Sequence, residues 1–288
     1  MNDTMTEIPL WTKFINWLLY SHFFIALCAV AMTLQTGYLV PAIDPGPTLL
    51  GLVFFSTLTI YALHRLVSAR KVGDALSIER FDIIRTYQHH IWGYTVLGIV
   101  GTAICFFLLP WRLKGALLLP GVLSLGYVFP FWGKQRLRLR DFHYLKIFLI
   151  AGVWAYVTVV LPAIDQGMPW HTILLLATER ALFIFMITLP FDLRDAHLDA
   201  YHAGKTLPTQ MGTTSTLYLA TGVYLLWSIL VGFLYPTPTS WALWASGGYA
   251  WILVCYAPKV KHDYYYTGLI DGTMLVQFGL IALVAAVF

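Results

Sequence analysis

Long apolar runs alternate with shorter polar connections from one end of the chain to the other. The runs lie at roughly 14–36, 48–64, 88–109, 114–131, 143–161, 171–189, 213–235, 241–257 and 266–288. Most approach the ~20 residues that a helix needs to cross a bilayer. They lack the strict alternation of half-buried strands, which favours helices. Helices also satisfy every backbone hydrogen bond internally, as lipid demands. We therefore predict an all-α, polytopic membrane helical bundle with nine transmembrane helices.

The composition strengthens this prediction. Hydrophobic residues make up 59% of the 288 residues and charged residues 11%, and the mean hydropathy is +0.71. Soluble domains carry about 25% charged residues. Cys28, Cys105 and Cys255 all lie in apolar runs without ligand spacing, so we interpret them as packing residues. No repeat or long linker divides the chain, and we expect a single domain over 1–288.

Lysine and arginine are unevenly distributed between the two sets of alternate connections. The connections after the second, fourth, sixth and eighth runs hold nearly all of them, whereas the opposite set holds only Arg112 and Lys114. Basic residues accumulate on the cytoplasmic side of membrane proteins. We expect an integral protein of a bacterial inner membrane, with the N-terminus cytoplasmic and the C-terminus external.

One stretch, "FDLRDAHLDAYHAGKTLP" (191–208), is much more polar than its surroundings. On a helix, the spacing of Asp192, Asp195 and Asp199 places the three carboxylates within about a 60° arc. Oxygen ligands on one face suit Mg²⁺, usually shared with substrate phosphates. Arg194 and Lys205 lie in the same stretch and are candidates for contact with a phosphate. The alternative is an acidic loop that is merely solvated.

This stretch resembles the second aspartate-rich motif of the UbiA superfamily of intramembrane prenyltransferases. Its D-x-x-D-x-x-x-D and G-K-T-L-P elements match, and it follows the predicted sixth span. The resemblance implies nine transmembrane helices and a cytoplasm-facing cavity. It also implies that Asp192, Asp195 and Asp199 are the catalytic residues and the ligands of Mg²⁺.

A second stretch, "YVFPFWGKQR" (127–136), follows the fourth run. It is similar to an aromatic–proline–basic stretch of the same superfamily, which implies that Tyr127, Lys134 and Arg136 face the substrate diphosphate. The alternative for the basic residues is anchoring at an anionic lipid surface, worth about 1 kcal/mol for each residue.

The place of the superfamily's first aspartate-rich motif departs from its N-D-x-x-D-x-x-x-D pattern. It reads "YALHRLVSARKVGD" and has no carboxylate before Asp74. A second Mg²⁺ therefore has no obvious ligands there. Residues at this place would instead line the cavity and supply positive charge to the substrate: Tyr61, His64, Arg65, Arg70 and Lys71. The alternative for the three basic residues is that they only set the membrane topology.

Glu179 and Arg180 lie near the middle of the predicted sixth span. Ionisable groups at that depth are costly and usually face a cavity or a partner. Adjacent helical residues point about 100° apart, so we expect only one of the two at a cavity wall. The alternative is an ion pair with another helix.

The resemblance implies a prenyltransferase that moves an isoprenyl or polyprenyl group from its diphosphate to a lipophilic acceptor, assisted by Mg²⁺. Membrane lipid would surround it, and no nucleic acid partner is expected. One alternative is a non-catalytic subunit of this fold that binds a lipid, quinone or pigment. Another is a membrane-bound terpene cyclase. A transporter is disfavoured because most polar residues collect at one face.

Overall fold

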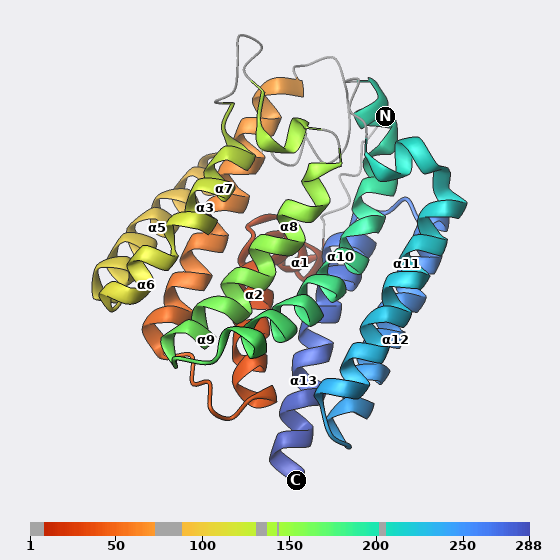
Figure 1. Ribbon diagram of the computed structural model, residues 1–288. Helices are drawn as coiled ribbons and strands as arrows, with labels where there is room; N and C mark the ends of the chain where they lie inside the picture. Colours follow the sequence, from red (N-terminus) through yellow and green to blue (C-terminus); the bar gives the residue numbers. More distant parts are fainter. Residues whose placement is uncertain (1–8, 73–87, 131–136, 143, 202–205) are drawn as a thin grey trace, which may run out of the picture.

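The computed structural model describes residues 9–72, 88–130, 137–142, 144–201 and 206–288, with the backbone alone for 68–72, 88 and 197–201. The regular elements of this part are helices (Figure 1). In chain order they are α1 (Leu10–Tyr20), α2 (Phe23–Leu39), α3 (Pro47–Val72), α5 (Gln88–Leu108), α6 (Trp111–Ala116), α7 (Leu118–Val128), η1 (Leu139–Asp141), α8 (Leu145–Ala155), η2 (Tyr156–Val160), α9 (Leu161–Asp165), α10 (Trp170–Tyr201), α11 (Leu207–Leu234), α12 (Thr239–Tyr256), η3 (Ala257–Lys259), η4 (Tyr265–Ile270) and α13 (Asp271–Val287).

The predicted all-α class is confirmed, and each predicted apolar run coincides with helical structure in the described residues. Within that part of the chain, six helical segments are long and apolar enough to span a membrane. The pair α1 and α2, bent by 60° around His22, would make a seventh. The α6–α7 segment and α12 are not among them. Nine membrane crossings remain a prediction.

The helices form two groups joined by central elements. Figure 1 shows α3, α5, α6 and α7 on one side and α10, α11 and α12 on the other, with α2, α8 and α13 between them. The larger buried apolar cluster lies among α2, α8 and α10 to α13. A smaller cluster joins α2 and α3 to α6 and α9. Helix α2 therefore contributes buried residues to both cores.

Close packing of α3 against α5 depends on small residues. A Cβ atom added at Gly101 would lie 2.4 Å from the ring of Phe55, and one at Gly98 would lie 2.4 Å from Oγ1 of Thr59. No side chain fits at such distances, so glycine permits the two backbones to approach. This is the small-residue packing that membrane helices commonly use.

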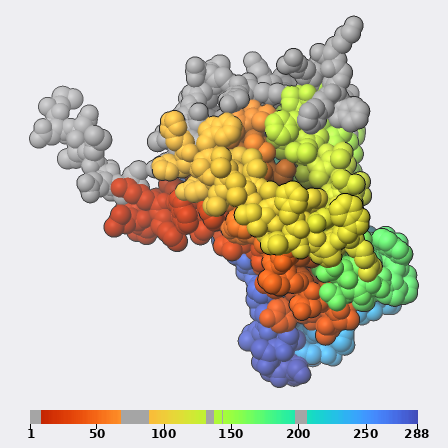
Figure 2. Space-filling model, turned by 90° about the vertical axis from the view of Figure 1, so that its left-hand side faces the viewer, coloured from red at the N-terminus to blue at the C-terminus, as the bar shows by residue number. Residues whose placement is uncertain are grey.

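The outer surface is apolar. Figure 2 views the face formed largely by α5 to α7, where Ile104 and Phe107 are 56% and 75% exposed. Phe233, on α11, is 85% exposed. Extended apolar surfaces are rare on soluble monomers, so these faces suit contact with lipid. The protein is an integral membrane protein.

A π-helical segment interrupts the fifth predicted run. The segment η2 lies between α8 and α9, and the hydroxyl of Thr36 on α2 donates to the backbone oxygen of Thr158, at 2.8 Å. A π-helical turn holds more residues than an α-helical turn and often marks a functional site. The extra backbone oxygen that it exposes is satisfied here by a neighbouring helix.

The ends of α3, α7, α10 and α12 lie at one end of the bundle, which we call the basic end because the connections that follow them carry most of the lysines and arginines. In Figure 1 the C-terminus lies at the opposite end, together with the turns that join α9 to α10 and α11 to α12. The site is built at the basic end.

Candidate functional site at the basic end

The last turns of α10 carry the predicted aspartate motif. The helix continues through Pro190 to Tyr201, so Asp192, Asp195 and Asp199 are all helical. Asp192 is almost fully buried, with 1% of its surface exposed. The side chain of Asp199 lies outside the described residues, and its convergence with the other two remains a prediction.

Asp192 is paired with a lysine from another helix. The Nζ atom of Lys146, the second residue of α8, lies 2.5 Å from Oδ1 of Asp192. The side chains are 12% and 2% exposed, respectively. A buried charge is costly unless it is paired, so this contact accounts for a carboxylate at such depth.

Asp195 is held by its neighbour Arg194. The guanidinium donates to both carboxylate oxygens, at 2.9 and 3.3 Å, and also to Asp263 Oδ1, at 2.6 Å. It lies over the rings of Tyr266 and Phe191, at 4.9 and 5.3 Å from their centroids. Arg194 therefore joins α10 to the segment before η4, and these contacts hold its planar group in place.

The same network reaches α3 through a tyrosine. The hydroxyl of Tyr20 donates to Asp263 Oδ2, at 3.3 Å. The guanidinium of Arg65 lies 5.5 Å from the centroid of the Tyr20 ring, which is within cation–π range. Arg65 and Arg194 are distant in sequence. Arg65 contacts the ring of Tyr20 and Arg194 contacts the carboxylate of Asp263, so both contact the same hydrogen-bonded pair.

A second group of side chains surrounds His64. Its ring contacts Arg140 of η1 and lies 5.8 Å from the ring of Tyr127. Arg140 in turn lies over the Tyr127 ring, at 5.4 Å from its centroid. Arg138 pairs with Asp141 at 2.8 Å, which fixes the short helix η1.

The two groups of side chains are close enough to interact electrostatically. The charges of Arg140, Arg138, Arg65 and Lys146 all act on His64. Deeper in the bundle, the indole N–H of Trp154 donates to the hydroxyl of Tyr61, at 3.3 Å. Cationic groups thus lie toward the basic end, and aromatic groups lie below them. The cations suit a phosphorylated head group, and the aromatic side chains suit an apolar tail.

The structure brings together all seven predicted residues whose side chains it describes: Tyr61, His64, Arg65, Tyr127, Asp192, Arg194 and Asp195. The side chains of other predicted residues lie outside the described residues: Arg70, Lys71, Lys134, Arg136, Asp199 and Lys205. For these residues the predicted roles stay predictions.

Several members of the site were not predicted from the sequence: Tyr20, Arg138, Arg140 and Lys146. The basic residues among them were interpreted only as topology signals. Lys146 did carry a usable signal, because it lies just inside an otherwise apolar run. A lone charge at such a place usually has a partner.

The described side chains do not form a ready magnesium site. Among them, no three His, Cys, Asp or Glu side chains lie together as ligands for a metal ion. Asp192 and Asp195 each already face a cation of the chain itself. Mg²⁺ requires near-octahedral oxygen ligands at about 2.0–2.1 Å. The described carboxylates would have to leave Lys146 and Arg194 to provide them.

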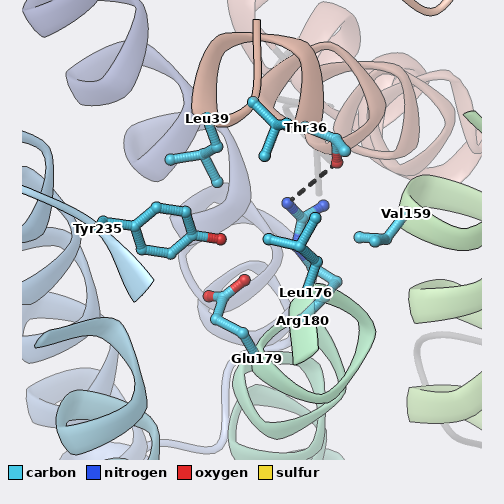
Figure 3. Close-up of a pocket in the computed structure, with 8 residues that line it drawn as sticks. Thr36, Leu39, Val159, Leu176, Glu179, Arg180 and Tyr235 are labelled. Carbon is cyan, nitrogen blue, oxygen red and sulfur yellow. Dashed lines mark hydrogen bonds between the residues drawn. The ribbon is translucent and has the colours of Figure 1, made fainter. Parts of the chain in front are cut away.

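Glu179 and Arg180 form a separate polar cluster in the interior of the bundle (Figure 3). Arg180 donates to the backbone oxygen of Met32 at 2.6 Å, and to the hydroxyls of Thr158 and Thr36 at 3.2 and 3.4 Å. Both residues line the same small cleft, contrary to the expectation that only one would face a cavity. Their long side chains reach it from two sides of α10.

The carboxylate of Glu179 has a neutral partner as well. Trp227 on α11 donates its indole N–H to Oε1, at 2.7 Å. Figure 3 shows the hydroxyl of Tyr235 pointing toward the same carboxylate. The predicted alternative, an ion pair with another helix, is not seen among the described residues. The hydrogen-bond partners of both charges on neighbouring helices are neutral groups.

No protein-family model matches the chain, and no curated protein matches its sequence. Solved structures match its fold. A UbiA homolog from Archaeoglobus fulgidus bound to GPP and Mg²⁺ has a TM-score of 0.62 over 93% of this chain and 99% of that chain, with 11% identity. A structure of digeranylgeranylglyceryl phosphate synthase has a TM-score of 0.56 over 96% and 100%, with 13% identity. The chain therefore shares the fold of these UbiA-like structures.

Proposed function

We propose that the protein binds an isoprenyl diphosphate at the basic end and transfers its prenyl group to a lipophilic acceptor. One observation carries the proposal: cationic side chains from α3, η1 and its N-cap, α8 and α10 gather above half-buried aromatic groups. They are Arg65, Arg138, Arg140, Lys146 and Arg194. A solved structure of the same fold holds GPP and Mg²⁺, which supports this choice of ligand.

The reaction follows from the charges. The bond between the first prenyl carbon and the diphosphate oxygen breaks, and its electron pair leaves with the oxygen. Fixed guanidinium groups such as those of Arg65 and Arg194 stabilise the negative charge that develops there. The acceptor then donates an electron pair to the carbon and loses a proton to solvent. Aromatic rings such as Tyr61 and Trp154 line the deeper part, where exclusion of water protects the allylic cation.

A non-catalytic isoprenoid-binding role is the second candidate. It is favoured by the absence of acidic residues from α3 and by the pairing of Asp192 and Asp195 with Lys146 and Arg194. In this role the ligand would bind and remain intact.

Binding and turnover of geranyl diphosphate separate the two candidates. Purified protein in detergent is incubated with labelled geranyl diphosphate and a bacterial lipid extract as the source of acceptor. Transfer predicts binding, release of pyrophosphate and label in the lipid fraction. Loss of one charged contact is worth about 1.5–3 kcal/mol, so Arg65→Met should bind at least tenfold more weakly. Arg112→Met, an exposed arginine on α6, is the matched control.

Binding without pyrophosphate release would favour the non-catalytic candidate. If neither geranyl diphosphate nor pyrophosphate binds to the natural protein, both candidates are wrong.

A further inference from the structure

We propose that Lys146 is a built-in counter-cation of Asp192, and that this site therefore holds a diphosphate group without a divalent metal ion. The inference rests on the proposed function, because it assumes that the basic end takes a diphosphate. It adds that side chains of the protein supply the positive charge that a metal ion would otherwise provide.

The first step is the geometry of the pair. Lys146 Nζ lies 2.5 Å from Asp192 Oδ1, and only 2% of the Asp192 side chain is exposed. A carboxylate at this depth requires a cation, because burial of an unpaired charge is very unfavourable. The ammonium group of Lys146 is in place on α8, which packs along α10. A metal ion at Oδ1 of Asp192 would have to displace this ammonium group.

The second step is that the next carboxylate is held in the same way. Arg194 contacts both oxygens of Asp195 and one oxygen of Asp263. The side chains of Asp195 and Asp263 are 22% and 19% exposed. A bidentate guanidinium is among the strongest partners that a carboxylate has in proteins. Of the three predicted metal ligands, the two whose side chains the structure describes, Asp192 and Asp195, are thus already paired.

The third step is the field around the pair. The charges of Lys146, Arg65, Arg138 and Arg140 act on the same His64 ring, and α3 supplies no acidic residue to oppose them. Cations at this end already form ion pairs with carboxylates, at Asp141, Asp192, Asp195 and Asp263. A divalent cation would have to compete with them for the carboxylates, whereas a diphosphate carries several negative charges and can take the place of a carboxylate beside them. The described side chains therefore favour the anion alone over the metal complex.

The test is binding of inorganic pyrophosphate and geranyl diphosphate to the purified protein, measured by calorimetry in EDTA and in excess Mg²⁺. We expect the dissociation constant to change by less than about threefold between the two conditions, well under the tenfold that corresponds to 1.4 kcal/mol. A loss of more than about tenfold in EDTA would overturn the inference. Mn²⁺ titrated in the presence of pyrophosphate should show no protein-bound ion by electron paramagnetic resonance.

Variants of the pair give an independent readout. In Lys146→Met the released Asp192 carboxylate becomes available to a metal. Metal-free affinity should fall about tenfold or more, and Mg²⁺ should restore most of it. Lys146→Arg should keep the metal-free binding. Lys114→Met, at the opposite end of the molecule, is the matched control and should behave as the natural chain does.

The double variant Lys146→Met/Asp192→Asn leaves no unpaired buried charge, so it guards against simple misfolding of Lys146→Met. It should bind weakly and gain nothing from Mg²⁺. Equal Mg²⁺ dependence in Lys146→Met and the natural chain would overturn the inference. Binding of the natural chain only with Mg²⁺ would overturn it as well but leave the proposed function standing. No binding in either condition would overturn both.

Discussion

The helix α10 carries two charged clusters that are stabilised in opposite ways. The interior cluster contains Glu179 and Arg180, each 1% exposed, and their partners on neighbouring helices are a backbone oxygen, two hydroxyls and an indole. In the end cluster, Asp192 and Asp195 face cations, and Arg194 and Asp195 are 18% and 22% exposed. Neutral dipoles satisfy the first cluster, and opposite charges satisfy the second.

This difference indicates different roles for the two clusters. In the interior, partners from α2, η2 and α11 are fixed by helices, so the contacts join α10 to three neighbours. At the basic end the partners are long charged side chains that are partly exposed, and a ligand of suitable charge can exchange with them. Buried charge alone therefore does not indicate a ligand site, and the nature of the partner is the better guide.

The sharpest test of the interior cluster is Arg180→Met. Removal of the guanidinium leaves the carboxylate of Glu179 buried without its neighbouring charge, and we expect the free energy of unfolding to fall by about 3 kcal/mol. Diphosphate affinity of the folded fraction should not change. Thermal unfolding in detergent, with Arg112→Met as the control, measures the loss. A loss below about 1 kcal/mol would contradict a structural role.

A second test disturbs the indole partner of Glu179 without touching a charge. A Cβ atom at Gly247 of α12 would lie 2.2 Å from the ring of Trp227. We expect Gly247→Ala to lower the free energy of unfolding by about 2 kcal/mol, since overpacking typically costs 1–3 kcal/mol. Gly279→Ala, where no atom lies within 4 Å, is the control. Equal stability of the two variants would show that Trp227 can move freely.

In the end cluster, Arg194→Met should change ligand affinity, unlike Arg180→Met in the interior cluster. The side chains of Arg194, Asp195 and Asp263 are only partly buried, so we expect a loss of about 1–2 kcal/mol in unfolding free energy, less than in Arg180→Met. Affinity for pyrophosphate should fall about tenfold, or 1.4 kcal/mol. Lys259→Met, at the same end, is the control because its ammonium group lies over the Tyr256 ring. A large stability loss with unchanged affinity would make both clusters structural.

The helical segments and the part of the site on α10 could be predicted from the sequence, for a physical reason. Apolar runs report directly on burial in lipid, and the spacing of Asp192 and Asp195 reports on helical geometry. The departure of α3 from the aspartate pattern was also visible, because it concerns residue types alone. Each of these features depends on residues that are close together in the sequence, so the local sequence pattern is enough to predict it.

Contacts between distant segments could not be predicted. The Lys146–Asp192 pair and the link from Arg194 through Asp263 and Tyr20 depend on which helices face each other. Helical periodicity does not contain that information. The bend at His22, which has a left-handed backbone with φ of 68°, likewise interrupts an unbroken apolar run. Tertiary packing decides such features.

The π-helical segment η2 limits which insertions and deletions the chain can tolerate. It contains an additional residue relative to an α-helical path between α8 and α9. Removal of one residue from Tyr156–Val160 would rotate everything that follows by about 100°. Leu161 would then turn away from the smaller core. Thr158 would also be displaced, and its hydroxyl could no longer accept the hydrogen bond from Arg180. An alignment of this chain with its relatives should therefore tolerate substitutions here far more readily than a change in length.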